Sequence, residues 1–245
     1  MRNIILPASL LLAFTACSSN SPKKLQTTVN PSGASDAVQS ITQLTSGLNS
    51  SDPQSVADAV LAMTAAGESV IVPAGGESAT ARIKSMIPAS WPRPRFTPAV
   101  TGSANCTPTS CTFDNYGDSE DGESFLLNGT ISWDGTTLSV DLTFDITGDG
   151  VTVSWQEQGM VTITPTLIDG SIHSKGSANA QGESGSWDIS VDYESIGLDS
   201  TGCPISGALG VSVDVSVSGS QDSGQYSGDA TIDFGPSCGA YSIEG

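Results

Sequence analysis

Two short stretches carry the residue types that acid–base or nucleophilic chemistry requires. The single histidine, His173, lies in the Gly/Ser-rich run Gly170–Lys175 and is the natural candidate for a general base. Residues Gly235–Gly239 read Gly-Pro-Ser-Cys-Gly and match the G-x-S-x-G pattern of a nucleophile elbow, which needs a strand before the serine and a helix after it. Here Pro236 precedes the serine, and the sequence after Cys238 continues as a strand pattern. We therefore interpret this stretch as a turn and His173 as an exposed strand residue, and we predict no catalytic residue; a hydrolase would need another base.

A cluster of carboxylates precedes the first long strand pattern, in the stretch Asp118–Glu123. Calcium takes about six to eight oxygen ligands, and this loop offers several. The stretch does not fit the EF-hand pattern, and the pair Asp145 and Asp149 is a smaller set of the same kind. Because no glycine-rich phosphate loop precedes a helix pattern either, we predict a solvated acidic loop, no resident metal and no cofactor. The calcium candidates that this interpretation sets aside are Asp118, Glu120, Asp121 and Glu123.

The charge balance restricts the partners. The chain carries a formal net charge of −18, and from Phe96 to Gly245 Lys175 is the only Lys or Arg, against 21 acidic residues. Such a surface repels the phosphate backbone of nucleic acids and anionic lipid head groups. It favours solubility and attracts cations or basic proteins. We therefore exclude nucleic acid as a partner, and the sequence leaves a protein partner unidentified.

Four of the five cysteines lie beyond residue 105. An even number of cysteines in an exported chain predicts disulfides, and four cysteines allow three pairings. We predict the pairs Cys106–Cys111 and Cys203–Cys238, because the members of each pair lie close together in the expected topology. The alternative, four thiolates on zinc, lacks any C-x-x-C spacing and conflicts with an oxidising compartment.

The fifth cysteine, Cys17, ends an N-terminal leader. A basic start, an apolar run over Ile4–Phe14 and two small residues before Cys17 are the order of a secretory signal peptide. The apolar run is about half of the roughly 20 residues needed to span a bilayer, so we do not expect a membrane helix.

The residues around Cys17 resemble a bacterial lipobox, with Phe14 where Leu is usual. The resemblance covers only the leader. It implies cleavage of a signal peptide before Cys17, acylation of that residue with palmitate-type chains, and a lipoprotein held in a membrane through those chains. Ser18 in place of Asp implies the cell outer membrane, with the periplasmic or surface face left open. The alternative is an ordinary secreted protein.

Apolar spacing then predicts helices. After a signal peptide over 1–16 and a flexible tether over 17–32, the segment 33–87 shows two stripes at three- and four-residue steps, separated by the helix-start signal Asp52-Pro53. We expect an αα-hairpin there, and a further helical turn or two within Glu77–Ile87. The stripe residues are Val38, Ile41, Leu44 and Leu48, then Val56, Val60 and Met63.

A proline-rich connector follows over 88–105. Four prolines within Pro88–Pro98 exclude helix and force an extended path. The connector carries two positive charges, Arg93 and Arg95, just before the acidic part of the chain. We favour a strap that lies over the following domain and forms salt bridges with it; the alternative is an aromatic and basic patch that binds a partner.

The period changes to two in the segment 106–245. Apolar residues at alternate positions, clearest from Leu138 to Ile146, are separated by Ser, Thr and Asp, and turn pairs such as Asp134-Gly135 recur between the runs. This pattern predicts an antiparallel meander of about eight or nine strands with one apolar and one wet face, and Gly159 suggests a bulge. The fold class is therefore mainly β with N-terminal helices (α+β): a strongly curved sheet or barrel whose apolar face the helical hairpin covers.

These features predict a membrane-anchored lipoprotein with a non-enzymatic structural or interaction role in the cell envelope. The alternative is a periplasmic carrier of lipid or another hydrophobic ligand, held in a half-barrel cavity beneath the helices. In that interpretation five aromatic residues line the cavity, whereas in the first they are ordinary core. They are Phe125, Trp133, Phe144, Trp155 and Trp187.

Overall fold

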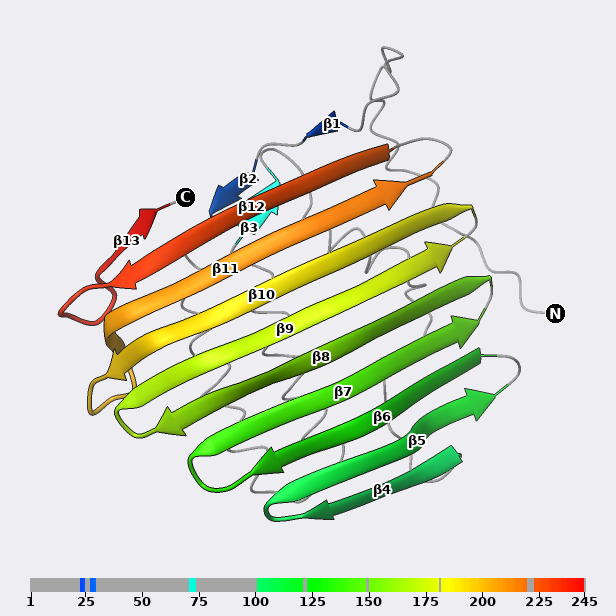
Figure 1. The fold of residues 1–245 in the computed structure, drawn as a ribbon, viewed down its shortest axis with the longest axis horizontal. Helices are drawn as coiled ribbons and strands as arrows, with labels where there is room; N and C mark the ends of the chain where they lie inside the picture. The colour runs from blue at the N-terminus through cyan, green and yellow to red at the C-terminus, as the bar shows by residue number, and fades with distance from the viewer. Residues whose placement is uncertain are drawn as a thin grey trace, which may run out of the picture.

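The computed structural model describes residues 101–120, 123–148, 150–180, 182–219 and 223–244, with three short strands nearer the N-terminus (Figure 1). These three are β1 (Lys23–Lys24), β2 (Thr27–Val29) and β3 (Ile71–Pro73). The signal peptide, Cys17, the predicted helices and the connector before Thr101 lie outside the described residues, and so do Asp121 and Asp149. What the sequence predicts for them remains a prediction.

Nine consecutive strands form an antiparallel meander in which each strand pairs with the next one along the chain (Figure 1). The alternating sequence and short Gly-containing turns dictate this topology, because antiparallel neighbours need only a tight connection. The strands are β4 (Thr101–Thr107), β5 (Ser110–Glu120), β6 (Glu123–Trp133), β7 (Thr137–Gly148), β8 (Val151–Thr164), β9 (Leu167–Ala180), β10 (Glu183–Leu198), β11 (Pro204–Ser218) and β12 (Ser223–Phe234).

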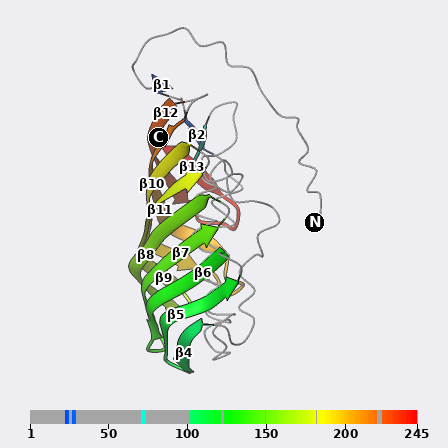
Figure 2. The same cartoon turned by 90° about the vertical axis from the view of Figure 1, so that its right-hand side faces the viewer.

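Two further strands extend the sheet beyond β12 to a total of 11 strands. Strand β1 pairs with the start of β12 in parallel, and β13 (Tyr241–Glu244) pairs with its end in antiparallel orientation. Strands β2 and β3 form a separate two-stranded sheet that contacts β12. Strand β4 forms the opposite edge, so the described residues make an open sheet, seen nearly edge-on as one twisted layer in Figure 2.

The prediction of an antiparallel meander is confirmed, and its nine strands, β4 to β12, agree with the expected eight or nine. Of the two expected forms, a strongly curved sheet or a barrel, the described residues form an open sheet, which has 11 strands in all. The register explains why the sheet stays open. The turn residues Glu123, Gly148, Val151, Ala180 and Glu183 all fall on one row across the strands. A barrel needs a stagger between successive strands, and rows without stagger give an open, twisted sheet. The described residues contain no helix, and the predicted helical cover lies outside them.

The two faces of the sheet have opposite character. Along β7, Leu138, Leu142 and Phe144 are 0% exposed, and Val140 and Ile146 lie on the same face. The residues between them are Ser, Thr and Asp with partial or full exposure. Each apolar side chain of this kind contributes roughly 1.5–3 kcal/mol when buried. The predicted division into an apolar and a wet, acidic face is confirmed.

The first strand of the meander lies partly inside the predicted connector. Strand β4 begins at Thr101, before the boundary at residue 106, and reads Thr-Gly-Ser-Ala-Asn-Cys-Thr. This run has almost no apolar alternation, because an edge strand is only partly covered and its burial pattern is mixed. Periodicity therefore could not detect it.

The bulge predicted at Gly159 is absent, since the pairing of β8 with both neighbours continues through it without a shift. A Cβ atom at Gly159 would lie 2.2 Å from the carbonyl oxygen of Ser171, so the glycine allows a close approach of backbones instead. Bulges occur where Asn115 and Ser195 adopt positive φ angles of 47° and 49°.

Each of these bulges is held by a side chain on the neighbouring strand. The backbone N–H of Asn115 donates to Oδ1 of Asn128 at 2.7 Å. The backbone N–H and the hydroxyl of Ser195 both donate to Oδ1 of Asp169 at 2.9 Å. A carboxylate or amide oxygen thus takes up donors that the bulge removes from the ladder.

Replacing Asp169 with alanine should lower the free energy of unfolding by about 1–2 kcal/mol, because two hydrogen bonds to the Ser195 bulge are lost. Asp169→Asn keeps the Oδ1 acceptor and should cost less than half as much. Urea denaturation of the two variants measures the difference. Equal losses would show that the charge of Asp169, rather than its two hydrogen bonds, supports the bulge.

Candidate functional site

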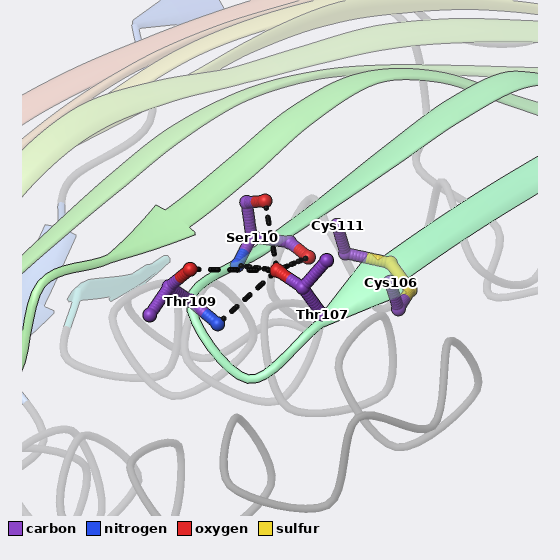
Figure 3. The surroundings of a disulfide bond; sticks show 5 residues. All are labelled: Cys106, Thr107, Thr109, Ser110 and Cys111. Atoms are coloured by element: carbon purple, nitrogen blue, oxygen red, sulfur yellow. Dashed lines mark hydrogen bonds between the residues drawn. A yellow bond between two sulfur atoms is a disulfide. The ribbon is translucent and has the colours of Figure 1, made fainter.

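The structure forms both predicted disulfides. Cys106 and Cys111 face each other across the β4–β5 hairpin with their Cα atoms 4.0 Å apart (Figure 3). Within that turn Thr107 Oγ1 accepts the backbone N–H of Ser110 at 3.1 Å. Cys203, just before β11, and Cys238, between β12 and β13, have Cα atoms 5.5 Å apart. The second disulfide therefore ties two loops on neighbouring strands at one end of the sheet.

The loop that carries Cys203 has its own polar support. Oδ1 of Asp199 accepts the backbone N–H groups of Thr201 at 2.8 Å and of Cys203 at 3.0 Å, and the hydroxyl of Thr201 donates to the same oxygen. The hydroxyl of Thr201 is the largest cause of a lowered pKa of Asp199. The loop is thus organised independently of the disulfide.

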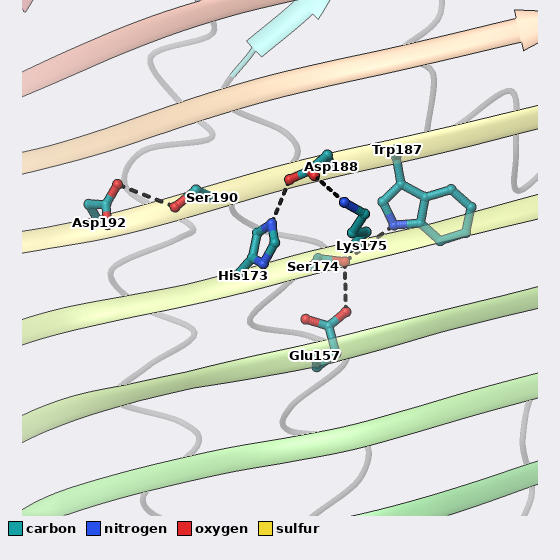
Figure 4. A network of polar contacts seen from close by, with 8 residues as sticks. All are labelled: Glu157, His173, Ser174, Lys175, Trp187, Asp188, Ser190 and Asp192. Atoms are coloured by element: carbon teal, nitrogen blue, oxygen red, sulfur yellow. Dashed lines mark hydrogen bonds and ion pairs between the residues drawn. The ribbon is translucent and has the colours of Figure 1, made fainter.

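The catalytic candidates lie apart. His173 is in β9 on the polar face, and its Nε2 is 2.5 Å from Oδ1 of Asp188 (Figure 4). Lys175 Nζ approaches the other oxygen of Asp188 at 3.0 Å. The hydrogen bond to His173 is the largest cause of the lowered pKa of Asp188. Ser190, opposite His173 across the strands, donates its hydroxyl to Asp192 instead, so this group is a surface ion cluster without an activated nucleophile.

The stretch that matches a nucleophile elbow is a turn. It connects β12 to the short strand β13, with no helix after the serine. The backbone N–H of Ala240 donates to the carbonyl oxygen of Ser237 at 2.9 Å, and Cys238 is in the disulfide. Ser237 lies three strands away from His173 in the sheet order.

The acidic stretch shows no metal centre in the part of the chain that the structure describes. Glu120 and Glu123 pair at the β5–β6 turn, with Asp118 further back along β5, opposite Phe125. Among the described residues no group of three or more His, Cys, Asp or Glu side chains is placed to hold a metal ion.

All five predicted aromatic residues pack on the apolar side of the sheet, and four of them lie close together. Phe144 and Trp155 stack with ring centroids 4.5 Å apart and 7° between their planes, and Phe125 lies 6.3 Å from Phe144. Trp155 and Trp187 flank Gly176, where a Cβ atom would lie 2.3 Å from the Trp187 ring. We call Phe125, Phe144, Trp155 and Trp187 the aromatic band.

Trp133 is not part of this band. It lies at the far end of β6, where its backbone N–H donates to the carbonyl oxygen of Thr109 at 2.8 Å. A hollow beside it, lined by the β4–β5 turn and the end of β6, has a volume of about 10 Å³. That volume holds about one water molecule and no lipid chain.

A buried polar group that the sequence interpretation overlooked lies beside the aromatic band. Glu157 in β8 is 0% exposed and Ser174 in β9 is 2% exposed, both on the apolar face. The hydroxyl of Ser174 donates to Oε1 of Glu157 at 2.9 Å, and the indole N–H of Trp187 donates to the Ser174 hydroxyl at 3.3 Å (Figure 4). The sequence contained a signal for this group. Side chains alternate between the two faces of a strand, and Glu157 follows Val153 and Trp155 at alternate positions, which places it on the apolar face.

No protein family, curated protein or solved structure matches this chain. In the described part of the chain, no helix is long and apolar enough to cross a membrane. The function must therefore be argued from the residues and their geometry.

Proposed function

We propose that the protein is a membrane-anchored lipoprotein of the cell envelope with a non-enzymatic role, as a structural or interaction module. The observation that carries the proposal is the pairing of the cysteines. The four cysteines of the sheet are paired with each other, which leaves Cys17 as the single remaining thiol of the chain. Disulfides accord with an oxidising compartment, and the lipobox-like leader supplies a reason for the unpaired thiol.

The architecture suits a displayed module. Residues 17–22 would tether the sheet to acyl chains in the outer membrane, because the rest of the predicted tether, 17–32, carries the paired strands β1 and β2. The helical hairpin within 33–87 would cover the apolar face. An apolar sheet face requires such a cover, because without one its apolar side chains would be exposed to water. The wet face, with Asp141, Asp192, Asp214 and Asp229 among its Ser and Thr residues, would remain available to a partner.

A carrier of a hydrophobic ligand is the second candidate, and the aromatic band is the observation that favours it. Its four large side chains lie on one face over β6, β7, β8 and β10. Phe144 is nevertheless fully buried and stacked on Trp155, as in an ordinary core. We therefore rank the structural module first.

Native mass spectrometry of the protein purified from its own membrane tests this proposal. We expect a chain that begins at Cys17, carries covalent acyl mass on that residue, contains two disulfides and retains no further lipid. Cys17→Ser is the matched control and should lose the acyl mass and membrane association with both disulfides intact. An unmodified Cys17 would contradict the lipoprotein proposal, and a non-covalently bound lipid would favour the carrier.

A further inference from the structure

We propose that the outer edge of β4 pairs in antiparallel orientation with β4 of a second copy of this chain, so that two sheets join across a two-fold axis. The proposal concerns the sheet edge Ser103–Thr107 and does not depend on lipidation. Among the described strands, β5 is the only one that pairs with β4, so β4 presents an open edge (Figure 1).

The two edges of the sheet differ. On one side, β1 pairs with the start of β12, β13 pairs with its end, and the β2–β3 sheet contacts the same strand. On the other side, β4 has no such addition among the described residues. Edge strands that avoid pairing carry charged residues or proline, but β4 has neither, and it is the only strand of the 11-stranded sheet without a charged residue. Its register shift lies between Thr101 and Ser103, which leaves Ser103–Thr107 regular.

The register shows which backbone groups of β4 face outward. Cys106 and Cys111 lie directly opposite each other, and their Cα atoms are 4.0 Å apart (Figure 3). The shorter of the two spacings in an antiparallel ladder, about 4.5 Å, belongs to pairs that exchange no backbone hydrogen bonds with each other. The N–H and C=O groups of Cys106 therefore point away from β5, and so do those of Ala104, two residues earlier. These groups can pair with a further strand.

A two-fold axis beside Asn105 uses all of these groups. In that register Asn105 lies opposite Asn105 of the second copy, and Ala104 lies opposite Cys106 of the second copy. Each of the two Ala104–Cys106 pairs exchanges two backbone hydrogen bonds, which gives about four across the seam. The disulfide holds β4 on β5, so the edge is ordered before the second copy binds and less entropy is lost on association.

A second copy fits this edge better than an unrelated extended segment. Rotation about an axis perpendicular to the sheet keeps each face on its own side. Ala104 and Cys106, which pack against the core, therefore meet their equivalents on the apolar face, while the exposed Asn105 side chains meet on the wet face. The seam is uncharged in both copies, whereas the net charge of −18 opposes contact through the acidic strands. The pairing also closes, because it uses the same edge of both copies.

A charge-swap experiment on the full mature chain, carrying Cys17→Ser to prevent acylation, tests this register. Sedimentation equilibrium measures the dissociation constant of the dimer. Asn105→Asp and Asn105→Lys each place like charges opposite one another across the axis, and each should raise the dissociation constant at least about fivefold. An equimolar mixture of the two variants should restore the wild-type value within about threefold, because opposite charges then face each other.

Asn179→Asp is the matched control, because Asn179 is exposed on β9, which pairs with a strand on both sides. It adds the same charge away from the seam and should change the dissociation constant less than about twofold. A chain that stays monomeric at every concentration would overturn the proposal and leave the edge to a strand of another protein. Equal weakening by Asn105→Asp and Asn179→Asp would also overturn it, because total charge rather than the β4 seam would then control association.

Ala104→Pro blocks the seam through the backbone and covers the case in which a variant of Asn105 does not fold. Since the N–H of Ala104 points outward, proline removes no hydrogen bond to β5 and is compatible with an edge strand. Half of the hydrogen bonds across the seam are lost, so the dissociation constant should rise at least about tenfold while the circular dichroism spectrum stays that of the wild type. A folded Ala104→Pro variant that dimerises like the wild type would overturn the proposal.

Discussion

Replacing Phe144 with alanine should lower the free energy of unfolding by about 3–5 kcal/mol, the range for truncating a fully buried phenylalanine. The ring of Phe144 is 0% exposed, stacks on Trp155 at 4.5 Å and lies 6.3 Å from Phe125. Leu127, its partner on β6, is also 0% exposed. The strands on both sides are held by continuous ladders, so the cavity cannot close by moving one of them.

Thr143→Ala is the matched control, because it changes the preceding residue of the same strand, whose side chain lies on the opposite face. It should change the free energy of unfolding by no more than about 0.5 kcal/mol. Urea denaturation followed by tryptophan fluorescence measures both variants, and Trp155 reports on the site itself. Similar losses in the two variants would contradict the assignment of this face as the core.

The Phe144 variant also separates the two proposed functions. If the aromatic band is core, the stability loss is large and no ligand affinity exists to be lost. If the band lines a cavity, truncation enlarges that cavity with a small loss of stability, because the removed ring had solvent or ligand beside it. The complete burial of Phe144 and its stacking on Trp155 favour the first outcome.

Much of the sheet was predictable because its two faces meet different surroundings. In β7 the alternation from Leu138 to Ile146 assigns every side chain to the correct face, since a one-residue slip would invert the whole pattern. The disulfides were predictable for a related reason: Cys106 and Cys111 flank a hairpin turn, and Cys203 and Cys238 flank neighbouring strands.

The edges and the closure of the sheet were not predictable in the same way. Alternation reports which face a residue is on, but it contains no information about whether the last strand meets the first. Strand β4 has little apolar surface to bury, so Thr101–Thr107 resembles a loop in composition. A glycine inside a strand pattern, such as Gly159, suggests a bulge. Here its small size instead allows the backbone carbonyl of Ser171 on the neighbouring strand to come close.

Glu157 shows what is missed when only the apolar residues of an alternating pattern are considered. The residue occupies the apolar register between Trp155 and Gly159, where a charged side chain contradicts the local pattern. Such contradictions concentrate at sites with a specific role. His173, by contrast, was singled out by its chemistry alone, and the structure pairs it with Asp188 on the exposed face.

Removing the disulfide Cys203–Cys238 should lower the free energy of unfolding by about 4 kcal/mol, and removing Cys106–Cys111 by about 2 kcal/mol. The sequence separations are 35 and 5 residues, and the entropy of closing the loop in the unfolded chain grows with the logarithm of its length. The paired variants Cys203→Ala/Cys238→Ala and Cys106→Ala/Cys111→Ala avoid lone thiols.

We expect loop entropy in the unfolded chain to decide which disulfide contributes more to stability, because in the folded state each site keeps its local hydrogen bonds without the disulfide. Asp199 still accepts the N–H groups of Thr201 and Cys203, and the β4–β5 hairpin keeps its ladder and the Thr107 contacts. Guanidinium denaturation of both variants in the Cys17→Ser background measures the two losses. A larger loss for Cys106→Ala/Cys111→Ala would contradict the chain-entropy explanation, and would mean that the short disulfide stabilises the exposed edge strand β4 directly.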